Sequence, residues 1–249
     1  MRLLITRPDP DGQRTAEALR AQGHDVLLVP MLHMEPVDFE LPERSYTAVV
    51  MTSANAARAL QMRPCRARLT SLPAFTVGRH TAQTARAIGF LEVHSADGNR
   101  DDLAKLLAVR FGASHATVVY LAGENIAGDL ALPPGSATVA TVVVYRMVKA
   151  DRFPPAAQAA LMQGEIDAVV HFSKRSAEAY TECARLSGVI ERALAPFHFC
   201  LSHRVAAPLA AHGASRIKIA PRPDEAALIE LVGSNAVLFA LGRGTGIDE

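Results

Sequence analysis

The sequence predicts an α/β protein with two similar parallel-sheet domains, one of them discontinuous. Three observations support this fold class. Short apolar runs alternate with alanine-rich amphipathic stretches, this pattern occurs twice along the chain, and two segments carrying proline and charge separate the copies. Strand–helix alternation of this kind favours parallel sheets with right-handed crossovers.

The expected strands are short and rich in β-branched residues, as buried parallel strands are. They lie at 2–6, 24–30, 47–53, 74–78, 92–95, 116–123, 138–147, 167–173, 197–202 and 216–220. The expected helices lie between them, and several end at a glycine suited to a helix C-cap. Their ranges are 12–23, 55–62, 81–90, 100–112, 156–164, 175–188, 205–213 and 224–233.

An internal repeat doubles this pattern. Residues 48–60 read AVVMTSANAARAL, and residues 168–180 read AVVHFSKRSAEAY. The similarity continues from AFTVGRHTAQTARAIG at 74–89 to HFCLSHRVAAPLAAHG at 198–213. Both copies therefore predict the order strand, serine turn, helix, strand, polar turn, helix.

A third pairing has the opposite order along the chain. The first strand–helix–strand unit of the chain resembles the unit that closes the first copy, so the second copy would take its missing unit from the N-terminus. The segments between the copies carry proline and charge, as linkers do. The predicted parts are a discontinuous domain of 1–35 plus 152–233, an inserted domain of 43–145, linkers at 36–42 and 146–151, and a tail at 234–249 whose last seven residues are expected to be disordered.

Composition excludes several classes of protein. The chain has 249 residues, 49% of them hydrophobic, and a formal net charge of +1. A balanced chain lacks the basic excess that binding nucleic acid by bulk charge requires. No apolar run approaches the length of a membrane span, and the N-terminus does not resemble a signal peptide, so we expect a cytoplasmic protein without membrane contact. Three cysteines without CxxC spacing are expected to be reduced structural thiols.

Small, hydroxylated and cationic residues follow many of the expected strands. Ligands of open parallel sheets bind beyond the carboxyl ends of the strands, where helix N-termini favour anions. These ends therefore predict a polyanionic ligand held between the two domains, although surface turns are often cationic without function. The residues in question include Thr6, Arg7, Ser53, Asn55, Gly78, Arg79, His80, Thr81, Ser173, Lys174, Ser202, His203 and Arg204.

Signatures of common catalytic sites are missing from the sequence. No GxSxG, HExxH or GxGxxG motif occurs, and GENIAGD at 123–129 lacks the Lys-Ser/Thr of a phosphate-binding loop. The histidines are scattered and predict no metal site. Tyr145 ends a strand at a domain crossing, where it could pack in the linker or donate a proton.

Five motifs in order resemble uroporphyrinogen-III synthase over residues 1 to about 233. They are TRP at 6–8, TSANA at 52–56, VGRHTAQTARAIGF at 77–90, VVVYRM at 142–147 and FSKRSAEAY at 172–180. The resemblance implies two flavodoxin-like domains joined by a two-stranded linker. It also implies cyclisation of the linear tetrapyrrole hydroxymethylbilane to uroporphyrinogen III, with inversion of the last ring and loss of water, for haem, sirohaem and cobalamin synthesis.

This family uses no metal and no organic cofactor, and its substrate carries eight carboxylates. The resemblance implies that Tyr145 is the general acid for the leaving hydroxyl, that Thr81 lies in the cleft, and that Arg7, Ser53 and Ser173 lie in cleft turns. A monomer is the default expectation, and we allow for a transient contact with the preceding pathway enzyme. Lys174 and Arg175 in the second serine turn, against the neutral Asn55 in the first, predict more carboxylate binding by the discontinuous domain.

Two positions depart from the family pattern. Val205 stands where a threonine is common, and Ala122 stands where many members have an arginine. Two other functions fit the residues: a two-domain binding protein for an anionic metabolite, and a transferase acting on a phosphorylated substrate. Conversion of the ligand separates the synthase from the first, and stabilisation by nucleotides or sugar phosphates would favour the second.

Overall fold

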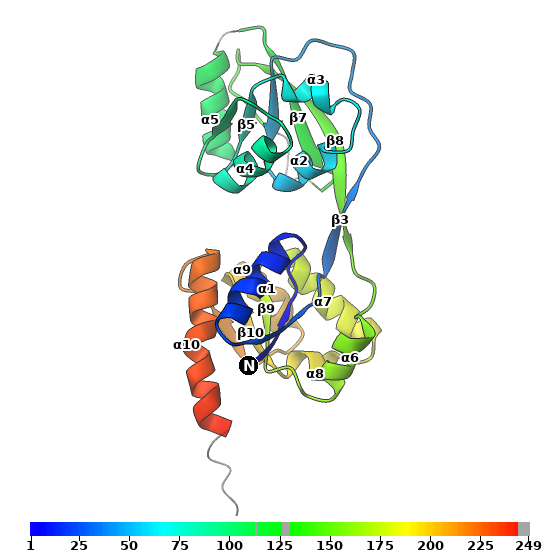
Figure 1. Ribbon diagram of the computed structural model, residues 1–249, viewed down its shortest axis with the longest axis vertical. Coiled ribbons are helices and arrows are strands. Elements are labelled where there is room, and N and C mark those ends of the chain that lie inside the picture. The colour runs from blue at the N-terminus through cyan, green and yellow to red at the C-terminus, as the bar shows by residue number, and fades with distance from the viewer. Residues whose placement is uncertain (113, 126–129, 244–249) are drawn as a thin grey trace, which may run out of the picture. The chain divides into compact units, whose positions relative to one another are not determined.

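The computed structural model describes residues 1–112, 114–125 and 130–243, with side chains up to Ala236. The chain divides into two compact units (Figure 1). Unit 1 contains Met1–His33 and Val148–Glu249, and unit 2 contains Met34–Met147. Unit 1 is thus assembled from two separate segments of the chain.

Unit 1 is built on a parallel five-stranded sheet with the order β11-β10-β9-β1-β2. All of these strands are short, and most of their residues are buried, which suits strands covered on both faces. The bounds are Arg2–Ile5 for β1, Asp25–Leu28 for β2, Ala168–His171 for β9, Phe197–Cys200 for β10 and Ile217–Ile219 for β11.

Most of the six-stranded sheet, ordered β3-β8-β7-β4-β5-β6, lies in unit 2, while the first residues of β3 and the last residues of β8 belong to unit 1. The five strands from β8 to β6 pair in parallel, as the predicted fold class requires. The bounds are Leu32–Pro36 for β3, Ala48–Met51 for β4, Ala74–Thr76 for β5, Val93–Ser95 for β6, Thr117–Gly123 for β7 and Thr138–Lys149 for β8.

The two sheets repeat one topology. Apart from β3, the order β6-β5-β4-β7-β8 matches β11-β10-β9-β1-β2 strand for strand. In unit 1 the strand beside β9 is β1, which comes from the N-terminal segment of the chain. In unit 2 the strand beside β4 is β7, which comes after β4, β5 and β6 in sequence. The pairing of opposite order in the repeat predicts this exchange. The α/β fold class and the internal repeat are therefore confirmed.

Helices cover both faces of the sheet in unit 1. Ala16 and Leu19 of α1 and Leu228 of α10 pack with Leu3 and Ile5 on one face. On the other face Tyr180 of α7 contacts strands β9 and β10, and α7 packs against α8 and α9. The bounds are Asp11–Ala21 for α1, Pro155–Met162 for α6, Lys174–Leu186 for α7, Ile190–Leu194 for α8, His203–Ala211 for α9 and Glu225–Arg243 for α10.

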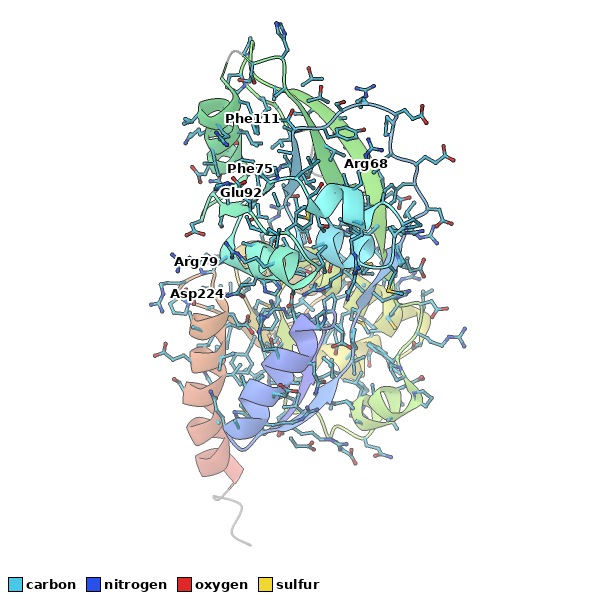
Figure 2. All side chains as sticks on the ribbon, turned by 45° about the horizontal axis from the view of Figure 1, so that its top comes forward. Arg68, Phe75, Arg79, Glu92, Phe111 and Asp224 are labelled. Carbon is cyan, nitrogen blue, oxygen red and sulfur yellow. The ribbon has the colours of Figure 1, made fainter. Side chains whose placement is uncertain are left out.

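Unit 2 has the same layering. Helices α2 and α4 bury alanines against one face of the sheet, whereas Leu103 and Leu107 of α5 pack on the other. On the α5 face Phe75 meets Phe111 edge to face, with ring centroids 5.5 Å apart (Figure 2). The bounds are Ala54–Leu60 for α2, Arg66–Thr70 for α3, Arg79–Ala87 for α4 and Arg100–Phe111 for α5.

The structure adds elements that the residue pattern alone does not predict. Strand β3 lies in and beside the segment predicted as a linker and runs beside β8, as the two-stranded linker implied by the resemblance requires. The bond from Val37 N to Val144 O (3.0 Å) and that from Ala150 N to Met31 O (3.0 Å) show that these two strands are antiparallel. Helices α3 and α8 are not predicted, because five residues are too few for a 3.6-residue periodicity to show.

The C-terminal helix continues further than expected. The pattern predicts its end near residue 233, whereas α10 runs to Arg243, inside the predicted tail. The predicted disorder of the last seven residues falls, apart from Arg243, outside the described residues. Within the described parts of the chain, no helix is long and apolar enough to cross a membrane.

Candidate functional site

In each unit the carboxyl ends of the parallel strands meet at one edge of the sheet, where the sequence predicts the ligand. In unit 2 the edge holds Ser53 and Asn55 at the start of α2, the Gly78–Thr81 segment at the start of α4, and Tyr145 in β8. In unit 1 it holds the predicted residues after β1, β9 and β10.

The repeated serine turns are helix N-caps. Ser53 Oγ accepts from the N–H of Asn55 (3.2 Å), and Ser173 Oγ accepts from the N–H of Ser176 (3.1 Å). The Ser173 hydroxyl also donates to Ser176 Oγ at 2.8 Å. The cap of α9, Ser202, makes no such side-chain bond. In the two repeat copies the serine therefore begins the helix and leaves its first amides directed toward the edge.

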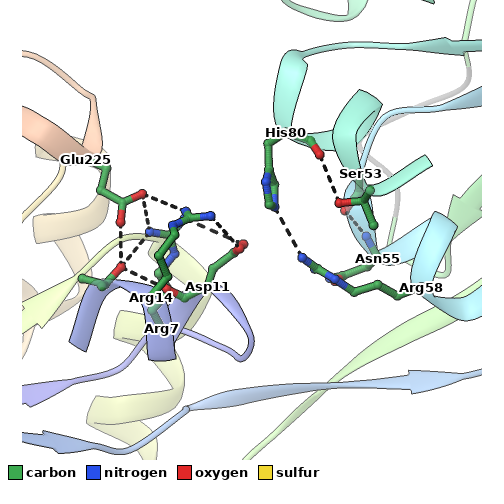
Figure 3. Close-up of polar contacts among 10 residues, drawn as sticks. Arg7, Asp11, Arg14, Ser53, Asn55, Arg58, His80 and Glu225 are labelled. Atoms are coloured by element: carbon green, nitrogen blue, oxygen red, sulfur yellow. Dashed lines mark hydrogen bonds and ion pairs between the residues drawn. The ribbon is translucent and has the colours of Figure 1, made fainter. Parts of the chain in front are cut away.

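A polar network joins α2 and α4 in unit 2 (Figure 3). Arg58 Nη1 donates to Asn55 Oδ1 at 2.8 Å, and Arg58 Nη2 lies 3.4 Å from His80 Nε2. Asn55 Nδ2 also donates to the sulfur of Met147 at 3.4 Å. The bond to His80 requires a neutral imidazole whose Nε2 accepts, so this network presents the charge of Arg58 at the edge.

The start of α4 combines an open backbone with an exposed cation. The N-cap Gly78 is extended, and nothing lies within 4 Å of where its Cβ would be. Arg79 is mostly exposed and donates from Nε to Asp97 Oδ2 at 3.0 Å. Hydrogen bonds from Ser95 and then Arg79 lower the pKa of Asp97. Thr81 is 7% exposed and points into the unit rather than to solvent.

Tyr145 lies against Gly123, the last residue of β7. Its ring packs partly buried on the core formed with Val142 and Val144. The carbonyl of Tyr145 accepts from the N–H of Glu124 at 2.8 Å, which holds the two strands together at their end.

In unit 1 Arg7 belongs to an ionic cluster (Figure 3). Its Nη1 lies 2.8 Å from Glu225 Oε2 and donates to Thr15 Oγ1 at 3.0 Å, while its Nη2 lies 3.8 Å from Asp11 Oδ2. Arg14 contacts the same two carboxylates. The side chain of Arg7 is only 18% exposed, so its charge is compensated within unit 1.

The same cluster sets the ionisation of Glu225. Burial alone would raise its pKa, but hydrogen bonds from Arg7 and Thr15 and the charges of Arg7 and Arg14 lower it overall. The guanidinium of Arg7 also lies 4.5 Å from the ring centroid of Phe172, in cation–π contact. Arg7 thereby connects β1, α1, α10 and the end of β9.

Below this edge a buried polar chain runs across three strands. Thr6 Oγ1 donates to Val170 O (3.0 Å) and lies 3.2 Å from His171 Nδ1, and His171 Nε2 lies 3.1 Å from His198 Nδ1. Because the Thr6 hydroxyl donates to Val170 O, we assign each neutral imidazole as donating from Nδ1 toward Thr6. His198 Nε2 is buried and makes no hydrogen bond of normal geometry, although the Leu194 carbonyl lies close enough to affect the pKa of the ring. Thr6 is fully buried, so its hydroxyl serves the sheet.

Burial controls the protonation of both histidines. It lowers the pKa of His198 to about 4, an effect that the carbonyl of Leu194 offsets only in part. Burial, and then the neighbouring His198, hold the pKa of His171 well below its usual value. Tyr180 covers the pair, with its ring centroid 5.2 Å from that of His171. The sequence pattern did not reveal this chain, because its three members are far apart in sequence.

An open pocket of about 410 Å³ lies beside the ends of β10 and β11. Ser202 and His203 line it on one side, and Pro221 and Pro223 on the other. Arg204 is exposed at the next position of α9. At the neighbouring turn Lys174 Nζ lies 3.4 Å from Glu178 Oε1, so part of its charge is already paired.

The two departures from the family pattern are both buried. Val205 is 5% exposed and Ala122 is 1% exposed. Neither side chain reaches the solvent at its edge. No three His, Cys, Asp or Glu side chains gather as metal ligands among the described residues.

Two residues of these edges were not predicted from the sequence. Arg58 lies one helical turn beyond Asn55, outside the predicted turn. Glu225 comes from a helix more than two hundred residues from Arg7. An i, i+3 relation could have identified Arg58, whereas no local pattern links Glu225 to Arg7.

Fold and edges define a class: a two-unit parallel α/β protein whose strand ends present hydroxyls, amides and cations. The comparisons identify the family. Residues 13–230 match the family model described as "Uroporphyrinogen-III synthase HemD". The chain therefore belongs to the uroporphyrinogen-III synthase family, enzymes that cyclise a linear tetrapyrrole in tetrapyrrole biosynthesis.

Solved structures agree in fold. Uroporphyrinogen-III synthetase from Helicobacter pylori is 20% identical, with a TM-score of 0.65 over 94% of this chain and 99% of that chain. A mutant uroporphyrinogen III synthase from the extremely thermophilic bacterium Thermus thermophilus is 17% identical, with a TM-score of 0.52 over 96% of this chain and 99% of that chain. A search of curated proteins gave no match.

Proposed function

We propose that this chain closes hydroxymethylbilane to uroporphyrinogen III without a metal or organic cofactor, using Tyr145 as general acid. The observation that supports this role most is the place of Tyr145. It lies in β8 next to Gly123 at the end of β7, and its ring packs against the core on the α2 and α4 face of unit 2. Catalysis then depends mainly on positioning and electrostatics.

The first step is loss of water. The Tyr145 hydroxyl gives its proton to the substrate hydroxyl, while the electron pair of the pyrrole nitrogen expels that hydroxyl as the carbon–oxygen bond breaks. The products are water, a phenolate and an azafulvene-type cation. The cation is attacked by the substituted carbon of the last ring, which forms a spiro intermediate. The original bond from that carbon to its bridging methylene then breaks, and the methylene bonds to the unsubstituted α-carbon of the same ring, which inverts the ring. Loss of the proton from that carbon makes the pyrrole ring aromatic again and restores the phenol, so protons balance.

We propose that the carboxylates of the substrate bind along the strand-end edges. In unit 2 the candidates are Ser53, Asn55, Gly78, Arg79, His80 and Thr81, and we add Arg58. In unit 1 they are Ser173, Lys174, Ser202, His203 and Arg204. The open N-termini of α4 and α9 favour anions. Thr6 and Arg7 would act from beneath the edge, because internal bonds already hold both side chains.

The test is to feed fresh hydroxymethylbilane and separate the uroporphyrinogen isomers. The wild-type chain should give isomer III, whereas the spontaneous reaction gives isomer I. Tyr145→Phe should lower turnover about 10²-fold or more, the usual contribution of a general acid, with little loss of stability. Tyr46→Phe is the matched control, since its hydroxyl bonds to Pro42 O within unit 2. Isomer I alone from the wild type would reject the synthase, and tight binding without conversion would indicate a binding protein.

We also propose that the protein works in the cytoplasm as a monomer and receives its substrate during a transient contact with the preceding enzyme. The reason is chemical: hydroxymethylbilane closes spontaneously to the wrong isomer, so a short transfer limits that loss. The fraction of isomer I in a coupled assay should fall when both enzymes are concentrated. A fraction independent of concentration would count against the contact.

A further inference from the structure

The end of β7 contains an irregularity that changes where Tyr145 points. The pairing of β7 with β8 is regular from Thr117↔Thr138 to Ala122↔Val143, and then skips to Gly123↔Tyr145. Val144 is therefore an extra residue on β8, a bulge in a parallel pair, where bulges are rare. The bond from Glu124 N to Tyr145 O closes the ladder beyond it.

The bulge reverses the side-chain alternation of the strand. Successive side chains of a regular strand point to opposite faces. Val142 and Val144 are both buried in the core on the α2 and α4 face, so regular alternation would direct Tyr145 to the other face. Instead Tyr145 packs against that same core. The extra residue thus brings the phenol to the face that also carries Arg58 and His80.

Gly123 is the surface on which the ring rests. A Cβ added there would lie 2.6 Å from Cζ and 2.9 Å from both Cε2 and Oη of Tyr145. Contacts below 3.0 Å essentially never occur for real Cβ atoms, so any other residue would push the rigid ring and its hydroxyl away. The backbone itself permits a side chain, because Gly123 is not among the glycines with positive φ.

We propose that Gly123 is a positioning residue: with the Val144 bulge it fixes the hydroxyl of Tyr145 for proton transfer to the leaving hydroxyl. This inference rests on the proposed role of Tyr145. A methyl group at position 123 displaces the phenol by the order of 1 Å, a misplacement that can cost about 10²-fold in rate. Binding of the substrate carboxylates elsewhere on the edges is left intact.

The first experiment measures Gly123→Ala for kcat, KM and isomer ratio. We expect kcat to fall about 10²-fold with KM changed less than about threefold, and a larger share of isomer I. Gly233→Ala is the matched control, since a Cβ there meets only the flexible end of Gln22 at 3.3 Å. The double variant Gly123→Ala with Tyr145→Phe should be no slower than Tyr145→Phe alone. Losses that multiply would show that Gly123 acts by another route and overturn the proposal.

The second experiment observes the ring directly. The chain has four tyrosines and no tryptophan, so 3-fluorotyrosine labelling gives few ¹⁹F NMR signals, and Tyr145→Phe assigns one of them. Gly123→Ala should move that signal and leave the others in place. If Gly123→Ala leaves the Tyr145 signal in place and has the wild-type kcat, the positioning role of Gly123 is overturned. If Tyr145→Phe has the wild-type kcat, the role of Tyr145 as general acid is overturned, and the signal shift in Gly123→Ala can still be measured.

A second variant covers the case in which Gly123→Ala does not fold. Glu124→Pro removes the amide that donates to Tyr145 O at the exposed end of the strand, and Glu124→Ala keeps that amide while removing the side chain. The proline variant should lower kcat and shift the Tyr145 signal more than the alanine variant does. Equal effects of the two would contradict a role of the bulge in placing the phenol.

Discussion

Three buried positions that correspond between the two sheets carry polar residues in unit 1 and apolar residues in unit 2. Strand pairing equates Leu4 with Val119, because each pairs with the second residue of its central strand, Val169 or Val49. Counting from these pairs places Thr6, His171 and His198 of unit 1 at the positions of Leu121, Met51 and Ala74. The three residues of unit 1 form the buried hydrogen-bonded chain, whereas the three residues of unit 2 belong to its hydrophobic core.

The next position along the strand also differs between the units. Arg7 of unit 1 occupies the position of Ala122 in unit 2. Arg7 is held by Glu225, whereas Ala122 is followed by Gly123 under the Tyr145 ring. Corresponding strands therefore have different roles: the end of β1 holds α10 through Arg7, whereas the ends of β7 and β8 place the Tyr145 ring on Gly123. Topology alone does not say which copy carries the chemistry.

The largest expected effect of this difference is acid sensitivity of unit 1. The folded pKa of His198, about 4, lies below its usual 6.5, and that of His171 is also lowered. At pH values between the lowered folded pKa and the usual pKa of 6.5, the unfolded chain binds protons that the folded chain does not. The free energy of unfolding therefore falls as pH drops through this range. The slope approaches about 1.4 kcal/mol per pH unit for each histidine.

Hydrogen exchange of the full chain between about pH 7 and 4.5 checks this, because it reports each unit separately. His171→Met introduces the residue found at the corresponding position of unit 2, Met51. It should remove about half of the pH dependence of the free energy of unfolding in unit 1. His115→Gln removes an exposed histidine of unit 2 and serves as control. Equal acid sensitivity of both units, or a slope unaffected by His171→Met, would contradict the prediction.

The next effect concerns the ionic cluster. Arg7→Met leaves Glu225 partly buried beside Arg14 alone, and should lower the free energy of unfolding by about 2 kcal/mol. Denaturant unfolding of Arg7→Met, Glu225→Gln and the double variant measures the coupling between the pair. A raised KM with unchanged stability would instead assign Arg7 to the substrate, as the sequence predicts.

The serine turns provide a smaller, paired comparison. Ser53→Ala and Ser173→Ala each remove an N-cap acceptor and should cost about 1 kcal/mol. The loss at Ser173 should be the larger, because its hydroxyl also serves the buried Ser176. Ser202→Ala removes no cap bond and should change the melting temperature least. A loss at Ser202 equal to the others would mean that capping does not explain the turns.

The smallest expected effect is at Lys174, which stands at the position of Ala54 in the first turn. Its pair with Glu178 is largely solvent-exposed, so Lys174→Met should change stability by only about 0.3 kcal/mol. If Lys174 binds a carboxylate of the substrate, KM rises severalfold at low salt and the effect fades as salt is added. An unchanged KM at low salt would remove Lys174 from the binding residues.

Much of the fold was accessible from the sequence because its signals are local. Strand-length apolar runs and amphipathic alanine-rich stretches predict most elements, and the repeat predicts the sheet order with the exchanged N-terminal unit. The residue pattern did not predict strand β3, because its residues, LHMEP, carry proline and charge and lack an apolar pattern; only the family resemblance implied a two-stranded linker there. The lengthened α10 was missed since Gly233 is typical of a helix end, although a helix interior tolerates glycine at modest cost.

The residues of the two sheet edges could be predicted only in part, because only signals between neighbouring residues can be recognised in the sequence. Ser53, Gly78 and Ser173 follow strands directly, and helix capping depends on neighbours in sequence, so these turns could be predicted. The partner of Arg7 could not, because it comes from α10.

By itself, the sequence determined the two parallel sheets, the interrupted unit and the family, since periodicity, repeats and ordered motifs are properties of neighbouring residues. Tertiary structure alone decided that Thr6 is buried with two histidines, that Arg7 is neutralised, and that a bulge seats Tyr145 on Gly123. These depend on strand register and on contacts between distant segments. Such distances are set by packing, and no local pattern in the chain encodes them.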